Sequence, residues 1–172
     1  DYRHNLTERV RASGGFRFDH AQMHVQSALA STNLYYQFQN TRRTSNADNY
    51  ASGNARITLL LPKGMELFAG AGTTGRIPDA QERYISRGMG SQATVGNSLL
   101  PVTRNTEVTT GWNVTHDRFY LRPALFYSFV NNYILVNNQP QWNVLGMAAS
   151  ATARSYANVD ARVYGGEMNY DV

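Results

Sequence analysis

The 172-residue sequence contains no cysteine, which excludes a disulfide framework, a thiolate metal site and a thiol nucleophile. Lysine is nearly absent and the arginines are scattered among acidic residues. The net charge is therefore a modest +4, and nucleic acid is not an expected partner. No stretch approaches the roughly 20 apolar residues of a membrane helix. If the chain meets a bilayer, strands must cross it, because only helices and closed barrels satisfy every backbone group in hydrocarbon.

The sequence also lacks an initiator methionine and a basic-then-apolar leader. It begins at Asp1, and we expect a processed chain or an excised piece. What is present is a β-rich mixture, in which 11 Tyr, 7 Phe and 2 Trp accompany many Asn, Thr, Ser and Gly residues.

Alternation with a period of two runs through the segment ERVRASGGFRFDH at residues 8–20. One parity carries Val10, Phe16 and Phe18, and the other carries Arg11 and Arg17. This pattern predicts a strand with one apolar and one polar face. A half-buried strand of a soluble protein and a barrel wall with a wet lumen would both show it.

Short turns and long polar segments alternate along the rest of the chain. Pro62 to Gly64 and Thr115 to Arg118 predict tight turns. The polar run at 39–54 and the segments at 76–104 and 131–156 are instead expected to be long loops, of roughly 25 residues in the longer cases. Outer-membrane barrels show this asymmetry, with short periplasmic turns and long extracellular loops. We predict strands near residues 7–20, 54–62, 64–76, 103–115, 118–136 and 156–172, with a further candidate at 33–41.

The hairpin GWNVTHDRFYLRPALFYSFVNN at residues 111–132 gives the clearest prediction of facing. We expect one face of the strands to contact lipid and the opposite face to contact water. Pro123, which costs a ladder hydrogen bond, is expected near a bulge or an interface rim. The residues predicted to face lipid are Val10, Ala12, Phe16, Phe18, Leu121, Leu125, Tyr127 and Phe129.

Four segments resemble, in order, recurring pieces of the barrel of TonB-dependent outer-membrane receptors. They are AGAGTTGRIPDAQERY (69–84), GNSLLPVTRNTEVTTGWNV (96–114), ALFYSFVNNYIL (124–135) and ANVDARVYGGEMNY (157–170). Within the family, three patterns together are most similar to the branch assigned to copper: Arg76-x-Pro78-Asp79-x-x-Glu82-Arg83-Tyr84, Tyr133-Ile134-Leu135 and Val163-Tyr164-Gly165-Gly166-Glu167. Asn97, which lacks its usual following proline, and Thr103, which replaces an acidic residue, depart from the family's pattern.

The resemblance implies an all-β fold of antiparallel up-and-down strands, as a section of a large transmembrane β-barrel. About seven strands are visible, and even the smallest barrels need about eight. We therefore expect residues 1–172 to be a partial barrel, with the plug domain and closing strands outside this chain. The resemblance also implies a Gram-negative outer-membrane location, outer-membrane lipid around the wall, and coupling to the TonB protein through the missing plug.

Active transport of a metal or metal complex is the implied function, with a copper ion favoured as the transported substrate and no resident cofactor. Imidazole and thioether groups suit copper. A ferric siderophore would instead want aromatic and arginine contacts. The candidate metal ligands are His20, Met23, His24, Met89 and Met147, and the candidate substrate-binding residues are Arg83, Tyr84, Arg87 and Trp142.

No grouping of base, nucleophile and orienting residue argues for catalysis, so an enzyme is not expected. The pattern Gly70-x-Gly72-x-x-Gly75 matches a phosphate loop in spacing but runs into Ile77-Pro78 rather than a helix. Two alternatives remain open from the residues, a soluble β-barrel or sandwich that binds a small ligand and a passive pore.

Overall fold

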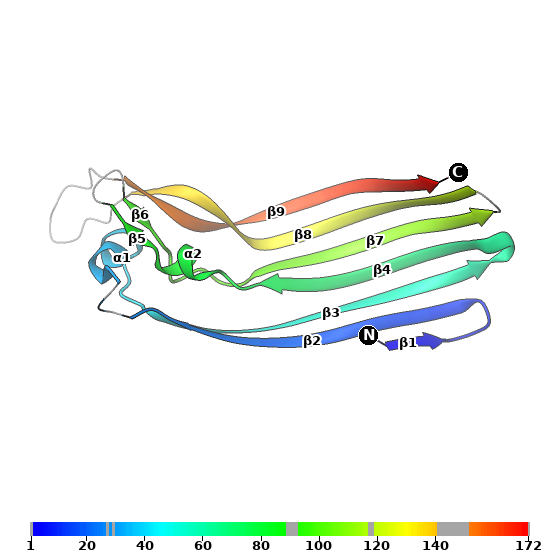
Figure 1. The fold of residues 1–172 in the computed structure, drawn as a ribbon, viewed down its shortest axis with the longest axis horizontal. Coiled ribbons are helices and arrows are strands. Elements are labelled where there is room, and N and C mark those ends of the chain that lie inside the picture. The colour runs from blue at the N-terminus through cyan, green and yellow to red at the C-terminus, as the bar shows by residue number, and fades with distance from the viewer. Residues whose placement is uncertain are drawn as a thin grey trace.

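The computed structural model describes residues 2–26, 28, 30–88, 93–116, 119–140 and 152–171. These residues form one nine-stranded sheet in the order β1-β2-β3-β4-β7-β8-β9-β6-β5, and Figure 1 shows its long strands lying side by side. Neighbouring strands are antiparallel, apart from the parallel pair of β6 and β9. The strands are β1 (Tyr2–Asn5), β2 (Val10–His24), β3 (Ser45–Leu61), β4 (Met65–Arg76), β5 (Ser86–Arg87), β6 (Thr94–Val95), β7 (Thr103–His116), β8 (Phe119–Pro140) and β9 (Thr152–Asp171).

The two ends of the sheet are built differently (Figure 1). At one end the strands are joined closely, as where the 3₁₀ turn Pro62–Gly64 links β3 to β4. At the other end lie the helices α1 (Thr32–Gln39) and α2 (Ala80–Tyr84), together with β5 and β6. The all-β prediction and the asymmetry between short turns and long connections are both confirmed. No described helix is long and apolar enough to cross a membrane.

Two predictions about the first long connection are wrong. The candidate strand at 33–41 is helix α1, because Tyr35 and Phe38 are three residues apart and both are buried in the cluster at this end. The polar run at residues 39–54, which we expected to be a loop, belongs largely to β3, which begins at Ser45. Its polar side chains form hydrogen bonds with residues near the helices. Asn46, for example, donates to the Ser98 carbonyl and accepts from the Tyr84 hydroxyl.

The long segments expected after β4 and within residues 131–156 also contain more structure than predicted. The first includes α2, β5 and β6. In the second, β8 continues to Pro140 and β9 already begins at Thr152. Strand β1, which pairs with β2 between Arg11 and Gly14, was not predicted.

The sheet has a polar face and an apolar face, because directly paired residues project to the same side. One row of pairs runs Gly15–Asn54–Gly72–Glu107–Ser128 across β2, β3, β4, β7 and β8. We call this side the polar face. It carries Arg17, Asn54, Arg56, Asn105, Glu107 and Ser128.

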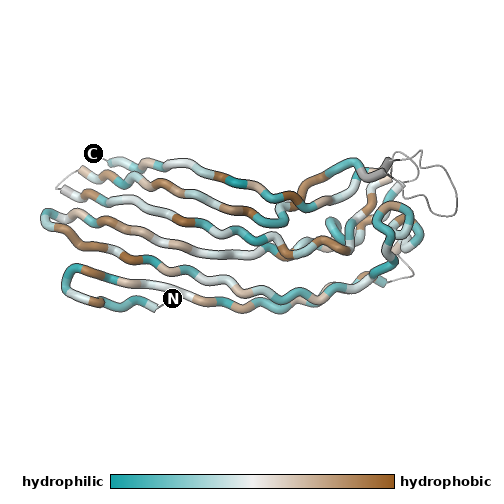
Figure 2. The backbone as a smooth tube through the Cα atoms, turned by 180° about the vertical axis from the view of Figure 1, so that it is seen from behind, coloured by the Kyte–Doolittle hydropathy of each residue, from teal (hydrophilic) through white to brown (hydrophobic). Residues whose placement is uncertain are grey.

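The opposite side, which we call the apolar face, includes the row Ala12–Ile57–Ala69–Thr110–Leu125. Its large side chains are exposed, with Phe16 78% and Leu125 60% accessible. In Figure 2 the hydrophobic colours gather in the half of β3 nearest the short turns, and hydrophilic colours mark its other half. All eight residues predicted to face lipid lie on this one face, as expected. A face this apolar and this exposed needs a covering layer.

Pro123 is the fifth residue of β8, so it lies near the short-turn end of the sheet. The pairs of β7 and β8 that flank Pro123 are Gly111–Ala124 on one side and Val114–Leu121 on the other, and the register between them is unchanged. The β-bulge of β8 is elsewhere, between Val130 and Tyr133. The expected position near a rim therefore fits the structure, and the expected bulge does not.

Replacing Gly111 by alanine should destabilise the sheet, because β7 and β8 approach each other too closely for a side chain there. A Cβ at this position would lie 2.4 Å from the Pro123 carbonyl oxygen and 2.7 Å from the Phe68 ring. Overpacking of this kind costs about 1–3 kcal/mol. Urea unfolding in lipid vesicles would measure the loss. Gly72→Ala is the matched control, since its nearest neighbours are 3.4 Å away, and equal stability of the two variants would contradict the prediction.

Candidate functional site

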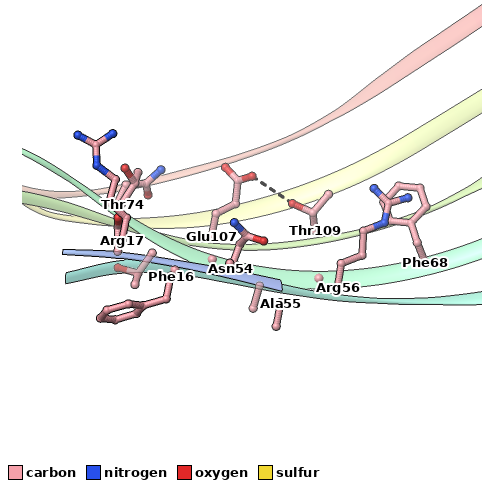
Figure 3. Close-up of a pocket in the computed structure, with 17 residues that line it drawn as sticks. Phe16, Arg17, Asn54, Ala55, Arg56, Phe68, Thr74, Glu107 and Thr109 are labelled. Carbon is pink, nitrogen blue, oxygen red and sulfur yellow. Dashed lines mark hydrogen bonds between the residues drawn. The ribbon is translucent and has the colours of Figure 1, made fainter. Parts of the chain in front are cut away.

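A groove on the polar face has a volume of about 620 Å³. Its floor contains the glycines Gly15, Gly70 and Gly72, which leave the backbone of three neighbouring strands uncovered. Figure 3 shows the polar side chains of Arg17 and Glu107 on the opposite side of the sheet from Phe16. The groove is therefore polar, and the opposite side of the sheet behind it is apolar.

Glu107 is the central acid of this groove. It accepts hydrogen bonds from the Thr109 hydroxyl at 3.1 Å (Figure 3) and from the Ser128 hydroxyl at 2.6 Å. The neighbouring Asn105 has a buried side-chain oxygen without a hydrogen-bond partner among the described residues. Two hydroxyl donors therefore hold the Glu107 carboxylate in place on the wall of the groove.

Further toward the short-turn end, an aromatic ring on the polar face is covered by arginines. The Arg56 guanidinium lies 3.9 Å from the centroid of Phe68, and that of Arg122 lies 6.0 Å from the same ring. Phe68 is consequently buried although it projects to the polar side. Figure 3 shows Arg56 reaching toward this ring at the edge of the groove. The stack places two fixed positive charges along the channel wall.

The end of the sheet with the long connections holds the main apolar cluster of the described residues, which we call the cap. It is formed by the buried side chains of Tyr35, Phe38, Tyr84, Ala93, Val95 and Ala153, with Met23, Val25, Ala30 and Leu34 packed against it. The cap joins segments that are far apart in sequence, since Gln39 donates to Ser155 Oγ at 2.5 Å and Ser155 donates to the Val95 carbonyl at 2.7 Å. The cap is thus a folded unit.

The pattern Arg76-x-Pro78-x-x-x-Glu82-Arg83-Tyr84 builds one side of this cap. Asp79 and Glu82 form a capping box that starts α2, with Glu82 N donating to Asp79 at 2.8 Å and Asp79 N donating to Glu82 at 2.9 Å. Arg76 donates to both oxygens of Glu82, at 3.0 and 2.7 Å. These motif residues therefore have a structural role, because they form the first turn of α2 and hold it against the end of β4.

Arg83 carries the motif into the interior. Its side chain is 0% exposed and donates to both oxygens of Asp48 on β3, at 2.5 and 2.8 Å, and to the Leu100 carbonyl at 2.8 Å. A buried guanidinium is tolerable only with such a partner. The pair attaches α2 to a strand 35 residues earlier in the chain.

Tyrosine and asparagine side chains extend the same network. Tyr84 donates from its hydroxyl to Asn46 Oδ1 at 2.8 Å, and Asn46 donates to the Ser98 carbonyl at 2.9 Å. Tyr35 donates to the Tyr84 carbonyl. Burial raises the pKa of both tyrosine phenols above their ordinary value, so they remain hydrogen-bond donors at neutral pH.

The predicted metal ligands are only partly brought together. His20 and His24 are exposed and four residues apart on β2, so about 13 Å of strand separates them and one ion cannot bind both. His20 Nδ1 lies 2.6 Å from Asn49 Oδ1. Met23 and His24 line one hollow of about 380 Å³, but as adjacent residues of β2 they project to opposite sides of the sheet. His24 lies on the side of Phe16 and Phe18, whereas Met23 lies on the polar side and packs against the cap. Within the described ranges no three His, Asp or Glu side chains form a metal-sized group. Met89 and Met147 lie outside the described residues.

The predicted substrate contacts are also divided. Arg83 and Tyr84 are buried, and their polar ends are engaged by Asp48 and Asn46. Substrate contact by either residue stays a prediction that requires the cap to open. Arg87, on β5, is exposed. Trp142 lies outside the described residues.

Sequence reasoning missed Asp48, Asn46, Glu107 and the Arg56–Phe68 stack. Glu107 had a usable signal, because it shares its parity with the other polar side chains of β7. Asn46 and Asp48 had none, since they sit in a polar run with low strand propensity.

Comparison with known proteins agrees with this architecture. The family model described as "TonB dependent receptor-like, beta-barrel" matches residues 1–172. No curated protein matches the chain. Among solved structures, the copper transporter OprC is 25% identical with a TM-score of 0.69, covering 96% of this chain and 24% of that chain.

Two other solved receptors share the fold. The Serratia marcescens hemophore receptor HasR, solved in complex with its hemophore HasA and heme, is 18% identical with a TM-score of 0.62, covering 95% of this chain and 30% of that one. The siderophore receptor PirA of Pseudomonas aeruginosa is 16% identical with a TM-score of 0.63, covering 96% of this chain and 28% of that one. The chain thus spans about a quarter of the length of these receptors.

The chain belongs to the TonB-dependent receptor β-barrel family. Proteins of this family lie in the outer membrane of Gram-negative bacteria, and the apolar face is the surface that such a location requires. The soluble alternative is set aside, because it leaves the exposed apolar face without a cover.

Proposed function

We propose that residues 1–172 are a section of the wall of a larger outer-membrane transporter that imports a metal or metal complex, with copper favoured. The plug domain and the remaining strands would lie outside these residues, and TonB would supply the energy through the plug. The observation that carries the proposal is family membership over the whole chain, joined to the polar, glycine-floored groove on the lumen side. The family is one of transport receptors, which also argues against an enzymatic role.

Copper is favoured because, of the neighbours described above, the copper transporter OprC has both the highest identity and the highest TM-score. Imidazole and thioether ligands at the outer mouth would suit this metal. His24 is the best placed of the predicted ligands, since it is exposed at the edge of a hollow that Met23 also lines, although the two side chains project to opposite sides of β2. Met89 and Met147 are proposed as its partners from neighbouring loops. His20 is a weaker candidate, since Asn49 already lies beside its Nδ1 atom.

A ferric siderophore is the second candidate, and the PirA neighbours favour it. Its organic shell would contact Arg87 and Trp142, and Arg83 and Tyr84 if the cap opens. A passive pore is the third, and a gene without an upstream plug domain would favour it.

Metal binding by the complete receptor tests the proposal. Cu(I), Cu(II) and ferric complexes would be titrated against wild type and against His24→Ala, Met147→Ala and His20→Ala. We expect copper to bind and the first two variants to weaken it, with a smaller effect of His20→Ala. His4→Ala is the matched control, because His4 is exposed on β1 near the short-turn end. A receptor that ignores copper and binds a ferric complex would overturn the copper assignment in favour of siderophore uptake.

A further inference from the structure

Two arginines lie on the apolar face at the end of the apolar series that runs from Leu121 to Phe129. Arg104, the second residue of β7, pairs with Asn131, and Arg162 of β9 pairs with Phe129. Both arginines are exposed. From Arg162 toward the short-turn end, the same face carries Tyr127, Leu125 and further apolar residues. The two guanidinium groups thus mark the upper boundary of the lipid-facing band on β7, β8 and β9.

Neither arginine has a partner among the residues that the structure describes, since no hydrogen bond or ion pair involves either side chain there. A charge on the lipid face is costly at the bilayer midplane and nearly free of cost at the interface. Phe129 lies beside Arg162, and Tyr127 and Tyr164 lie one turn of the pleat nearer the short-turn end, with their rings stacked at 6.1 Å. Aromatic rings of this kind mark headgroup level. The arginines therefore project among lipid headgroups.

The spacing of the two arginines suits one multiply charged headgroup. Strand β8 lies between them and their rows differ by two residues, so their Cα atoms are roughly 12 Å apart. Extended arginine side chains can converge across that distance. The exposed side chain of Asn131 lies between them and can donate as well.

The two guanidinium groups outnumber the one acid beside them on β9, so the local charge is positive and favours an anion. That acid is Asp160, two residues from Arg162 on the same face, and its carboxylate accepts a hydrogen bond from the Asn132 backbone N–H at 3.0 Å. Guanidinium forks match phosphate oxygens in geometry and bind them through paired, charge-assisted hydrogen bonds. The end of the sheet with the long connections is the extracellular end, so the lipid concerned belongs to the outer leaflet.

We infer that Arg104 and Arg162 bind phosphate groups of the phosphorylated glycolipid of the outer leaflet, forming a lipid site on the outer surface of the wall. This site is separate from the lumen groove and from the transported substrate. It would fix the vertical position of β7 to β9 in the membrane.

The test uses the complete receptor in nanodiscs and lipid A as the probe. Native mass spectrometry would count retained lipid A for wild type, for R104Q/R162Q and for R154Q. Arg154 is the matched control, because it is exposed on the same strand eight residues beyond Arg162, roughly 26 Å away and above the headgroups. We expect the double variant to lose affinity by about ten-fold or more, and R154Q to match wild type.

Dephosphorylated lipid A and phosphatidylglycerol separate the alternatives. Weak retention of both by the wild type supports a phosphorylated glycolipid site, and this measurement does not depend on any variant folding. Equal retention of dephosphorylated lipid A would overturn the role of phosphate. Equal retention of phosphatidylglycerol, or an equal loss in R154Q, would reduce the site to general attraction of anions and overturn the assignment.

Discussion

Replacing Arg83 by alanine is expected to lower the free energy of opening of the cap by about 3–5 kcal/mol, because the Asp48 carboxylate is left buried without its counter-ion. Asp48 is 11% exposed, so water replaces the guanidinium poorly. The Leu100 carbonyl loses its donor at the same time. Amide hydrogen exchange of the complete receptor would report this directly, as faster exchange around Asn46 and Leu100.

Two further variants make this result interpretable. Arg87→Ala removes an exposed arginine four residues away and should leave exchange unchanged. Arg83→Met combined with Asp48→Leu removes both charges and should recover part of the loss, as buried ion pairs replaced by apolar residues often do. Unaltered exchange in Arg83→Ala would show that the pair does not hold the cap together.

Replacing Leu125 by arginine is expected to cost about 2–4 kcal/mol of folding free energy in lipid, if this residue lies at the bilayer midplane. Leu125 is the central position of the outward series Leu121, Pro123, Leu125, Tyr127 and Phe129, and it is 60% exposed on the apolar face. Urea unfolding of the complete receptor in lipid vesicles would measure the cost.

The control for Leu125→Arg places the same charge on the other side of the wall. Thr109→Arg puts a guanidinium in the lumen groove beside Glu107, where water and a carboxylate can receive it. Leu125→Ala separates the loss of apolar contact from the introduction of charge. If Leu125→Arg and Thr109→Arg unfold at the same urea concentration, the assignment of the two faces fails.

The transmembrane part of the fold was predictable because each strand follows a local rule. Alternation with a period of two identified both faces of β2 and of the β7–β8 hairpin, from Val10 to Phe18 and from Leu121 to Phe129. Pro62 and Gly64 located the turn between β3 and β4. These features depend only on neighbours within a few residues.

The cap was not predictable, because long-range contacts define it. Helix α1 was mistaken for a strand, since its few apolar residues suit either structure until the cluster that buries Tyr35 and Phe38 is known. Arg83 was assigned to substrate contact because the motif indicates its presence but not its direction. Its partner Asp48 lies in a polar stretch that resembled a loop. Identifying this pair requires the pairing of β2 with β3, which brings Asp48 into the wall.

The parallel contact between β6 and β9 limits the height of the barrel rim. A strand has two edges, and between Arg154 and Ser155 both edges of β9 are occupied, one by β8 and the other by β6. Any strand that continues the wall beside β9 can therefore pair with it only from Tyr156 onward, toward the short-turn end. The wall of the barrel is therefore lower beside β9 than at β8 and β9 themselves. Such a notch would give ligands a sideways approach to the mouth, immediately beside the cap.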